Sequence, residues 1–401
     1  MGCSLDTEGS TNYNNNDMTM KKNITNRQSK FAVLILTSSF MMLSNSILFN
    51  SLHAFGQQIL QTDSIQNQTT LQSNNATKSG FLRMESQELN NIFKNAANSV
   101  VYIQVDLGHN YFSSGSGFVY DSNNGYIITN NHVVNGSISR KADVTFSDGN
   151  TYTAKIIGTD VYDDIAVLQI VDDFSAEHLV PLTLANSSKL QVGQLVIAIG
   201  NPGVGGVLTL SDTMTMGIVS QVGRIFLSSI GGFAETDLIQ TDTSINRGNS
   251  GGPLLDADGH VVGITTLGLK NSTGLNFAIP SNLVLRIAPA IIQIGHYEHP
   301  WLGFSGDTLS PLVAENLLGL PRNTKGVVLF SVDVGGPLDK AGLKRGDIIA
   351  ATDRMPIRTI GDLLTYLEEH KSVGDNINLT VNREGQLMDF NATVQARPSS
   401  S

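Results

Sequence analysis

The sequence predicts a mainly β protein in which two antiparallel barrels precede a small α+β domain. Three observations predict it. Short β-like runs recur between turn signals from residue 100 to residue 279, a helical pattern follows at 281–295, and strands alternate with helices after residue 300. Regularly spaced short strands separated by turns are typical of antiparallel barrels. The 401 residues also give room for two or three domains with a sizeable core.

The first 83 residues do not follow this pattern. Residues 1–30 are polar and Asn-rich, which predicts a disordered cytoplasmic tail. Residues 31–55 are apolar, carry no Asp, Glu, Lys or Arg, and follow a basic flank. They predict either a transmembrane anchor with an exported remainder or a cleaved signal peptide ending near Ala54. Residues 56–83, rich in Gln, Asn, Ser and Thr, predict a flexible linker. We therefore expect a single-pass cell-membrane protein, or a secreted one if the segment is cleaved.

The β-like runs form two sets of six. The first barrel is expected from residues 100–105, 117–120, 125–129, 143–146, 151–158 and 165–170, and the second from 195–200, 213–221, 238–241, 253–255, 261–267 and 275–279. Apolar residues at helical spacing predict a short amphipathic helix before them, at 84–97. A helix with Ser281 as its N-cap and Gly295 just past its end would close this domain, which we place at 84–295.

Three segments carry the residue types of a catalytic triad. Ser250 lies among glycines, His132 follows a β-like run, and Asp164 precedes an apolar run. A serine nucleophile needs an imidazole to take its proton, a carboxylate to orient that imidazole, and two N–H groups aimed at the developing oxyanion. We assign those donors to the amides of Gly248 and Ser250. The chain order His, Asp, Ser is that of chymotrypsin-like enzymes.

Five ordered motifs make the resemblance specific. They are TNNHVV at 129–134, DIAVLQI at 164–170, GNP at 200–202, GIVS at 217–220 and GNSGGPLL at 248–255. Together they resemble the HtrA/Deg family of serine proteases. The resemblance implies a chymotrypsin-like double β-barrel and an ATP-independent serine endopeptidase, a homotrimer that cleaves misfolded or unfolded polypeptides and uses no cofactor.

The family pattern also selects among neighbouring residues. Asp163 and Asp160 compete with Asp164 for the orienting role, and the resemblance favours Asp164 because it adjoins Ile165-Ala166. Asp163 is then expected to be a solvated neighbour. Residues 265–267 are expected to line the edge where the substrate backbone pairs, and Arg247 is interpreted as a surface residue.

The C-terminal region, which we place at 300–398, resembles a PDZ domain. The likeness rests on the turn Trp301, Leu302, Gly303 and Phe304, and on AGLKRGDII at 341–349. It implies that backbone N–H groups of this turn capture a peptide C-terminal carboxylate. The bound peptide would add as a strand to the edge of the sheet.

Composition and missing motifs exclude several function classes. The net charge of −10 and the lack of a long basic run argue against nucleic acid as a partner. The only cysteine, Cys3, excludes an intramolecular disulfide. The sequence contains no HExxH, CxxC or GxxxxGK[ST] pattern, so we expect no metal and no nucleotide. Two alternatives stay open: a proteolytically silent PDZ chaperone or scaffold, and a regulatory protease that cuts one membrane partner.

Overall fold

The computed structural model describes residues 86–398, except 202, 205–207, 210–211, 228–233, 247 and 269–273. The predicted tail, apolar segment and linker lie outside the described residues, and so does Arg247. No helix within the described part is long and apolar enough to cross a bilayer, so the structure gives no support to the predicted single-pass membrane location.

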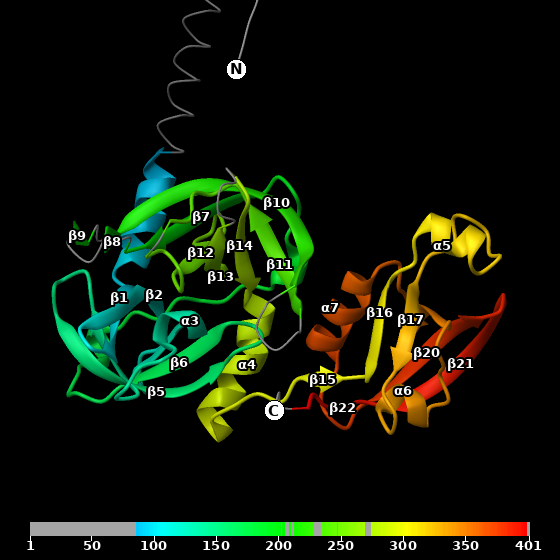
Figure 1. Ribbon diagram of the computed structural model, residues 1–401. Helices are drawn as coiled ribbons and strands as arrows, with labels where there is room; N and C mark the ends of the chain where they lie inside the picture. Colours follow the sequence, from blue (N-terminus) through cyan, green and yellow to red (C-terminus); the bar gives the residue numbers. More distant parts are fainter. Residues whose placement is uncertain are drawn as a thin grey trace, which may run out of the picture. The chain divides into compact units, whose positions relative to one another are not determined.

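The first barrel is a closed six-stranded antiparallel sheet with strand order β1-β2-β3-β6-β5-β4 (Figure 1). Pairing of β1 with β4 closes it. Its strands are β1 Val100–Gly108, β2 Tyr111–Asp121, β3 Tyr126–Asn130, β4 Lys141–Thr145, β5 Thr151–Asp160 and β6 Ile165–Ile170, and the one-turn helix α3, Asn131–Val134, follows β3. Alternate residues of these strands, such as Val101, Ile103, Ala166 and Leu168, form a buried apolar cluster inside the barrel, as period-2 alternation predicts.

The second barrel repeats the arrangement with strand order β10-β11-β14-β13-β12-β7. Its strands are β7 Leu195–Gly200, β10 Thr213–Leu227, β11 Ala234–Thr241, β12 Pro253–Leu255, β13 Val261–Gly268 and β14 Asn276–Pro280, with the two-residue strands β8 Gly203–Val204 and β9 Leu208–Thr209 between β7 and β10. The turns η1, Ala176–His178, and η2, Ser187–Lys189, lie between the two barrels in sequence. The predicted double barrel is thus confirmed.

One apolar cluster joins the two barrels. It contains Phe118 and Ile165 from the first barrel, Ile197 and Leu255 from the second, and Ile287 from helix α4 (Ser281–Ile294), all buried. The apolar face of the helix at 86–97 packs against the same cluster, which confirms the helix expected before the barrels. Burial of this surface stabilises the barrels against one another, because apolar burial contributes about 25 cal/mol per Å².

Helix α4, Ser281–Ile294, differs from the prediction at its start. Pro280 is the N-cap, and Ser281 is the first helical residue. The buried Ser281 Oγ donates instead to Ala185 O at 2.6 Å, a bond that satisfies a hydroxyl with no access to water. Gly295 ends the helix at φ 85°, the left-handed conformation that favours glycine.

The C-terminal domain is a curved sheet with helices against it. Its sheet has the order β16-β17-β18-β20-β21, and β19 pairs with β18. The strands are β15 Pro300–Trp301, β16 Phe304–Thr308, β17 Val327–Val332, β18 Ile348–Thr352, β19 Met355–Pro356, β20 Asn376–Arg383, β21 Gln386–Thr393 and β22 Gln395–Ala396, and the helices are α5 Pro311–Asn316, α6 Pro337–Lys340 and α7 Ile360–His370. Figure 1 shows α7 beside β16, which is an edge strand of the sheet.

Candidate active site

His132 and Asp164 meet at one end of the first barrel. His132 lies in α3, directly after β3, and Asp164 directly precedes β6, the neighbour of β3 in the sheet. His132 Nδ1 lies 2.6 Å from Asp164 Oδ2, and the backbone N–H of His132 donates to Asp164 Oδ1 at 2.8 Å. The carboxylate therefore holds both the ring and the backbone of the histidine.

The surroundings of the two side chains differ. The His132 side chain is 48% exposed and the Asp164 side chain only 12%. Asp164 Oδ2 also accepts a 2.8 Å hydrogen bond from Thr266 Oγ1 of β13. When Nδ1 donates to this fixed carboxylate, Nε2 of the neutral ring is left as the basic nitrogen on an accessible imidazole. That is the form a general base requires.

Ser250 comes from the second barrel, in the turn before β12. Its Oγ donates to Thr266 O at 2.9 Å. Thr266 thus contacts both other parts of the site, since its hydroxyl bonds Asp164 and its carbonyl accepts from Ser250. Hydrogen bonds through Thr266 therefore link Ser250 of the second barrel to Asp164 and His132 of the first.

Ser116 of β2 anchors the turn that carries Ser250. Its backbone N–H donates to Ser250 O at 2.8 Å, and its Oγ donates to Gly248 O at 2.6 Å. The same Oγ accepts from Asn201 N at 2.8 Å. These bonds orient the peptide groups beside the Gly248 and Ser250 amides that we assign to the oxyanion. The role of Ser116 was missed from sequence, although its place between Gly115 and Gly117 was a signal for close backbone packing.

Gly251 shows why glycine follows the serine. Its φ is 88°, and its N–H donates to Thr265 O at 2.8 Å. A Cβ added there would overlap Ser116 O and Thr129 Oγ1. Both the backbone conformation and the close approach of β2 therefore require glycine.

The expectation of a solvated Asp163 needs correction. Asp163 is not solvated but 5% exposed, and its Oδ2 lies 3.7 Å from His299 Nδ1. The substrate edge expected at 265–267 stays a prediction; the Thr265 side chain is buried, and its Oγ1 donates to Asn249 O at 2.5 Å. Leu267 lies in β13 opposite Phe277. The interior offers Asp163 and Thr265 partners that spacing along the chain does not reveal.

Two groups of acidic and histidine side chains in the described part come close enough to hold a cation. The buried group consists of Asp160, Asp163 and His299. The more exposed group consists of Asp256, Asp258 and His260. In the buried group His299 Nε2 already lies 2.7 Å from Asp160 Oδ2, so the ring itself supplies the positive partner. We interpret this group as an ion-pair cluster.

The predicted carboxylate-binding turn lies between β15 and β16. Leu302 is buried, and Gly303 has φ 77°. Leu302 O accepts from Leu338 N at 3.1 Å and Gly303 O accepts from Asp333 N at 3.0 Å, which fixes both carbonyls toward the domain. Trp301 lies in β15, and Phe304 begins the edge strand β16. A peptide could therefore pair with β16 beside α7.

Comparison with known proteins agrees with this architecture. Residues 115–264 match the trypsin-like peptidase domain, and residues 306–394 match the PDZ domain. The fold thus defines a trypsin-like peptidase domain followed by a C-terminal PDZ domain. The chain belongs to the HtrA/Deg family of serine proteases.

Individual relatives carry this assignment. The chain is 42% identical over 286 residues to the serine protease Do-like HtrA of Bacillus subtilis, covering 69% of this chain and 62% of that protein. It is 34% identical over 385 residues to the probable periplasmic serine endoprotease DegP-like of Marinomonas sp., covering 93% and 78%. The match to periplasmic endoprotease DegQ of Escherichia coli, 36% identical, covers 72% of this chain and 60% of DegQ. The chain thus spans less than two thirds of the length of several curated relatives.

Solved structures show the same likeness. The HtrA-type protease AlgW with tripeptide superposes with a TM-score of 0.64 at 35% identity, covering 77% of this chain and 97% of that chain. AlgW with decapeptide gives 0.62 at 33% identity and covers 77% and 99%.

Proposed function

We propose that this chain is an endopeptidase that hydrolyses peptide bonds in misfolded or unfolded polypeptides. Ser250 is the nucleophile, His132 the general base and then the general acid, and Asp164 orients His132. The observation that carries the proposal is the pair of bonds from His132 Nδ1 and N to the two oxygens of Asp164, at 2.6 and 2.8 Å. These two hydrogen bonds favour the His132 tautomer whose Nε2 accepts a proton.

The reaction follows the usual order of acyl transfer. Ser250 Oγ attacks the substrate carbonyl while its proton passes to His132 Nε2. The tetrahedral oxyanion takes hydrogen bonds from the amides of Gly248 and Ser250. His132 then protonates the leaving amine, and water attacks the acyl-enzyme by the same route in reverse.

A labelling experiment tests the proposal. The full chain and its Ser250→Ala variant are incubated with an unfolded protein and with a fluorophosphonate probe, beside a Ser139→Ala control at an exposed turn. We expect cleavage and labelling by the wild type and the control, and a loss of about a million-fold in kcat for Ser250→Ala, since triad members act as a unit. Equal labelling of Ser250→Ala would contradict the assignment.

A regulatory protease is the second candidate. The observation that favours it is the 2.9 Å bond from Ser250 Oγ to Thr266 O, because a hydroxyl has one proton to donate. Attack requires this proton to turn from Thr266 toward His132. We infer that a C-terminal peptide bound at 301–304 promotes this change, which is in keeping with AlgW having been solved with peptides. Activity that rises only when a C-terminal peptide is added would favour this role.

We also propose a homotrimer, on the family resemblance. Sedimentation of the full chain gives the mass directly, and a monomer at micromolar concentration would contradict it.

A further inference from the structure

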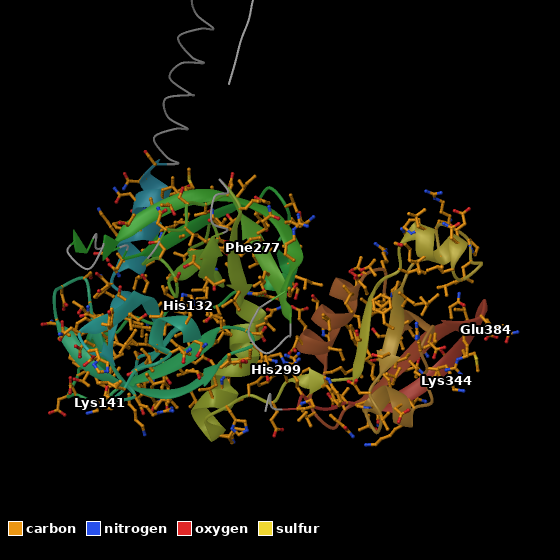
Figure 2. All side chains as sticks on the ribbon, in the orientation of Figure 1. His132, Lys141, Phe277, His299, Lys344 and Glu384 are labelled. Carbon is orange, nitrogen blue, oxygen red and sulfur yellow. The ribbon has the colours of Figure 1, made fainter. Side chains whose placement is uncertain are left out.

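His299, the residue just before β15, is labelled in Figure 2. A buried charged cluster surrounds it. The His299 side chain is 2% exposed. Its Nε2 lies 2.7 Å from Asp160 Oδ2, and its Nδ1 lies 3.2 and 3.3 Å from the two oxygens of Glu368 in α7. Each of these contacts needs an N–H donor, and a neutral imidazole has only one. With Asp160 and Glu368 ionised, the geometry therefore requires a charged imidazolium.

The groups around the ring support that charge. Burial alone lowers the pKa of His299, but the hydrogen bonds to Asp160 and Glu368 outweigh it and raise the pKa to about 10. Arg397 adds a second cation, with Nη2 at 3.0 Å from Glu368 Oε1. Burial raises the pKa of Asp163 well above its usual range, which favours its neutral form. Two cations then face two carboxylates.

Aromatic rings close the cluster on the remaining sides. The ring centroids of Tyr162 and Tyr297 lie 5.1 and 4.8 Å from that of His299, both edge-on. The Tyr297 side chain is hydrogen-bonded to that of Arg286 in α4, and the Arg397 guanidinium lies over the Tyr162 ring. These rings exclude water, so the contacts of the imidazolium are stronger than they would be at the surface.

Asp160 connects this cluster to the triad. It ends β5, and its Oδ1 accepts from Tyr162 N at 2.8 Å and from Asp163 N at 3.4 Å. These bonds shape the turn that ends at Asp164, whose φ of 53° is unusual for a residue other than glycine. One oxygen of Asp160 thus shapes the turn while the other is held by His299.

We propose that His299 is a positioning residue for the hydrolysis. By binding Asp160, His299 fixes the turn that presents Asp164. By binding Glu368, it couples the conformation of that turn to the position of helix α7 of the PDZ domain. The inference rests on the proposed function, because Asp164 matters to the rate only if it orients His132.

Substitutions of His299 in the full chain test this. His299→Gln keeps one donor but no charge, whereas His299→Arg keeps several donors and the charge. We expect His299→Gln to lower kcat by about 10- to 100-fold with little change in KM, the loss typical of a small displacement in an active site. His299→Arg should restore most of kcat. His260→Gln, at an exposed turn, is the matched control and should resemble the wild type.

The pH profile separates positioning from a merely structural role. Loss of the His299 proton near pH 10 should give the wild type a fall in kcat that His299→Arg lacks, because a guanidinium stays charged. Glu368→Gln should lower kcat less than His299→Gln, since the bond to Asp160 remains. A folded His299→Gln variant with wild-type kcat would overturn the proposal. If that variant does not fold, an unchanged alkaline fall in His299→Arg would overturn it instead.

A second readout does not depend on activity. Amide hydrogen exchange at Tyr162 and Asp163 reports the turn directly, and we expect it to be at least about tenfold faster in His299→Gln than in His260→Gln. In His299→Arg it should stay close to that of His260→Gln, because the guanidinium keeps a charged donor toward Asp160. Exchange in His299→Gln as slow as in His260→Gln would overturn the positioning role. A wild type that neither cleaves nor labels would instead refute the proposed function and leave this readout standing.

Discussion

Thr266 Oγ1 donates a 2.8 Å hydrogen bond to Asp164 Oδ2, and this bond joins the second barrel to the carboxylate of the first. The Thr266 carbonyl accepts from Ser250 Oγ. One residue of β13 therefore contacts both the proposed nucleophile and the proposed orienting carboxylate. Changes at Thr266 should affect the two together.

Replacing Thr266 by valine removes the hydroxyl and keeps the side-chain shape. We expect the free energy of unfolding to fall by about 2 kcal/mol, since a hydrogen bond to a charged group is lost from a buried site. The value of kcat should fall roughly tenfold as Asp164 gains freedom. Steady-state kinetics and urea unfolding measure both. Thr266→Ser is the control, and a deficit as large as that of valine would contradict this role of the hydroxyl.

Replacing Asp164 by asparagine should keep the fold and lower kcat by about 10⁴-fold. The amide would present a donor to His132 Nδ1 and favour the wrong tautomer. Rates of peptide hydrolysis measure the loss. Asp143→Asn, on the exposed side of β4, should be nearly silent. A loss at Asp164 no larger than at Asp143 would show that another carboxylate orients His132.

Replacing Gly251 by alanine should destabilise the fold both by backbone strain and by overlap of the added Cβ. The same substitution at Gly149 measures the strain alone. Gly149 has φ 87°, much like the 88° of Gly251, but a Cβ there meets nothing within 4 Å. Gly149→Ala should therefore cost only the backbone strain, about 1–2 kcal/mol. Gly251→Ala should cost roughly 3 kcal/mol or more, because its Cβ also overlaps β2. Thermal unfolding of both variants gives the comparison, and equal losses would show that the overlap is relieved at no cost.

Asp237 of β11 should make stability depend on pH. Burial, aided by the charge of Glu369, raises the pKa of Asp237 from 3.8 to about 7. It lines a cavity of about 210 Å³ together with Glu369. The folded state then binds this proton more tightly than the unfolded chain does. The contribution of Asp237 protonation to the free energy of unfolding is therefore complete below about pH 4 and is lost as the pH rises toward 7.

Asp237→Asn tests this pH dependence. The amide stays neutral, and asparagine tolerates the φ of 58° at this position. The free energy of unfolding of the variant should not fall in this pH range. At pH 8 it should exceed that of the wild type by up to about 4 kcal/mol, from about 1.4 kcal/mol per pKa unit. Urea unfolding from pH 4 to pH 8 measures it, with Asp148→Asn, in an exposed turn, as the control. Parallel curves for the wild type and Asp237→Asn would refute the assignment.

Most of the fold was predictable because its signals are local. Alternating apolar residues and turn residues indicate β strands whatever their partners, and twelve predicted runs correspond to the twelve barrel strands. The residues at which strands and helices begin and end were less predictable. Strand β10 runs to Leu227 rather than to residue 221, since pairing with β11 extends it past the apolar pattern. Ser281 was misplaced as an N-cap because its partner, Ala185 O, is 96 residues away in the chain.

The sequence by itself determined the fold class, the order His132, Asp164, Ser250, and the glycines around the nucleophile, because these depend on residue type and spacing. Only the tertiary structure decided that Asp163 is buried, that Thr266 bridges two barrels, and that His299 lies between Asp160 and Glu368. Charge and burial at these positions come from residues far apart in the chain. A buried polar group takes whichever partner the packed interior brings within hydrogen-bond distance, and the sequence pattern around it carries no record of that partner.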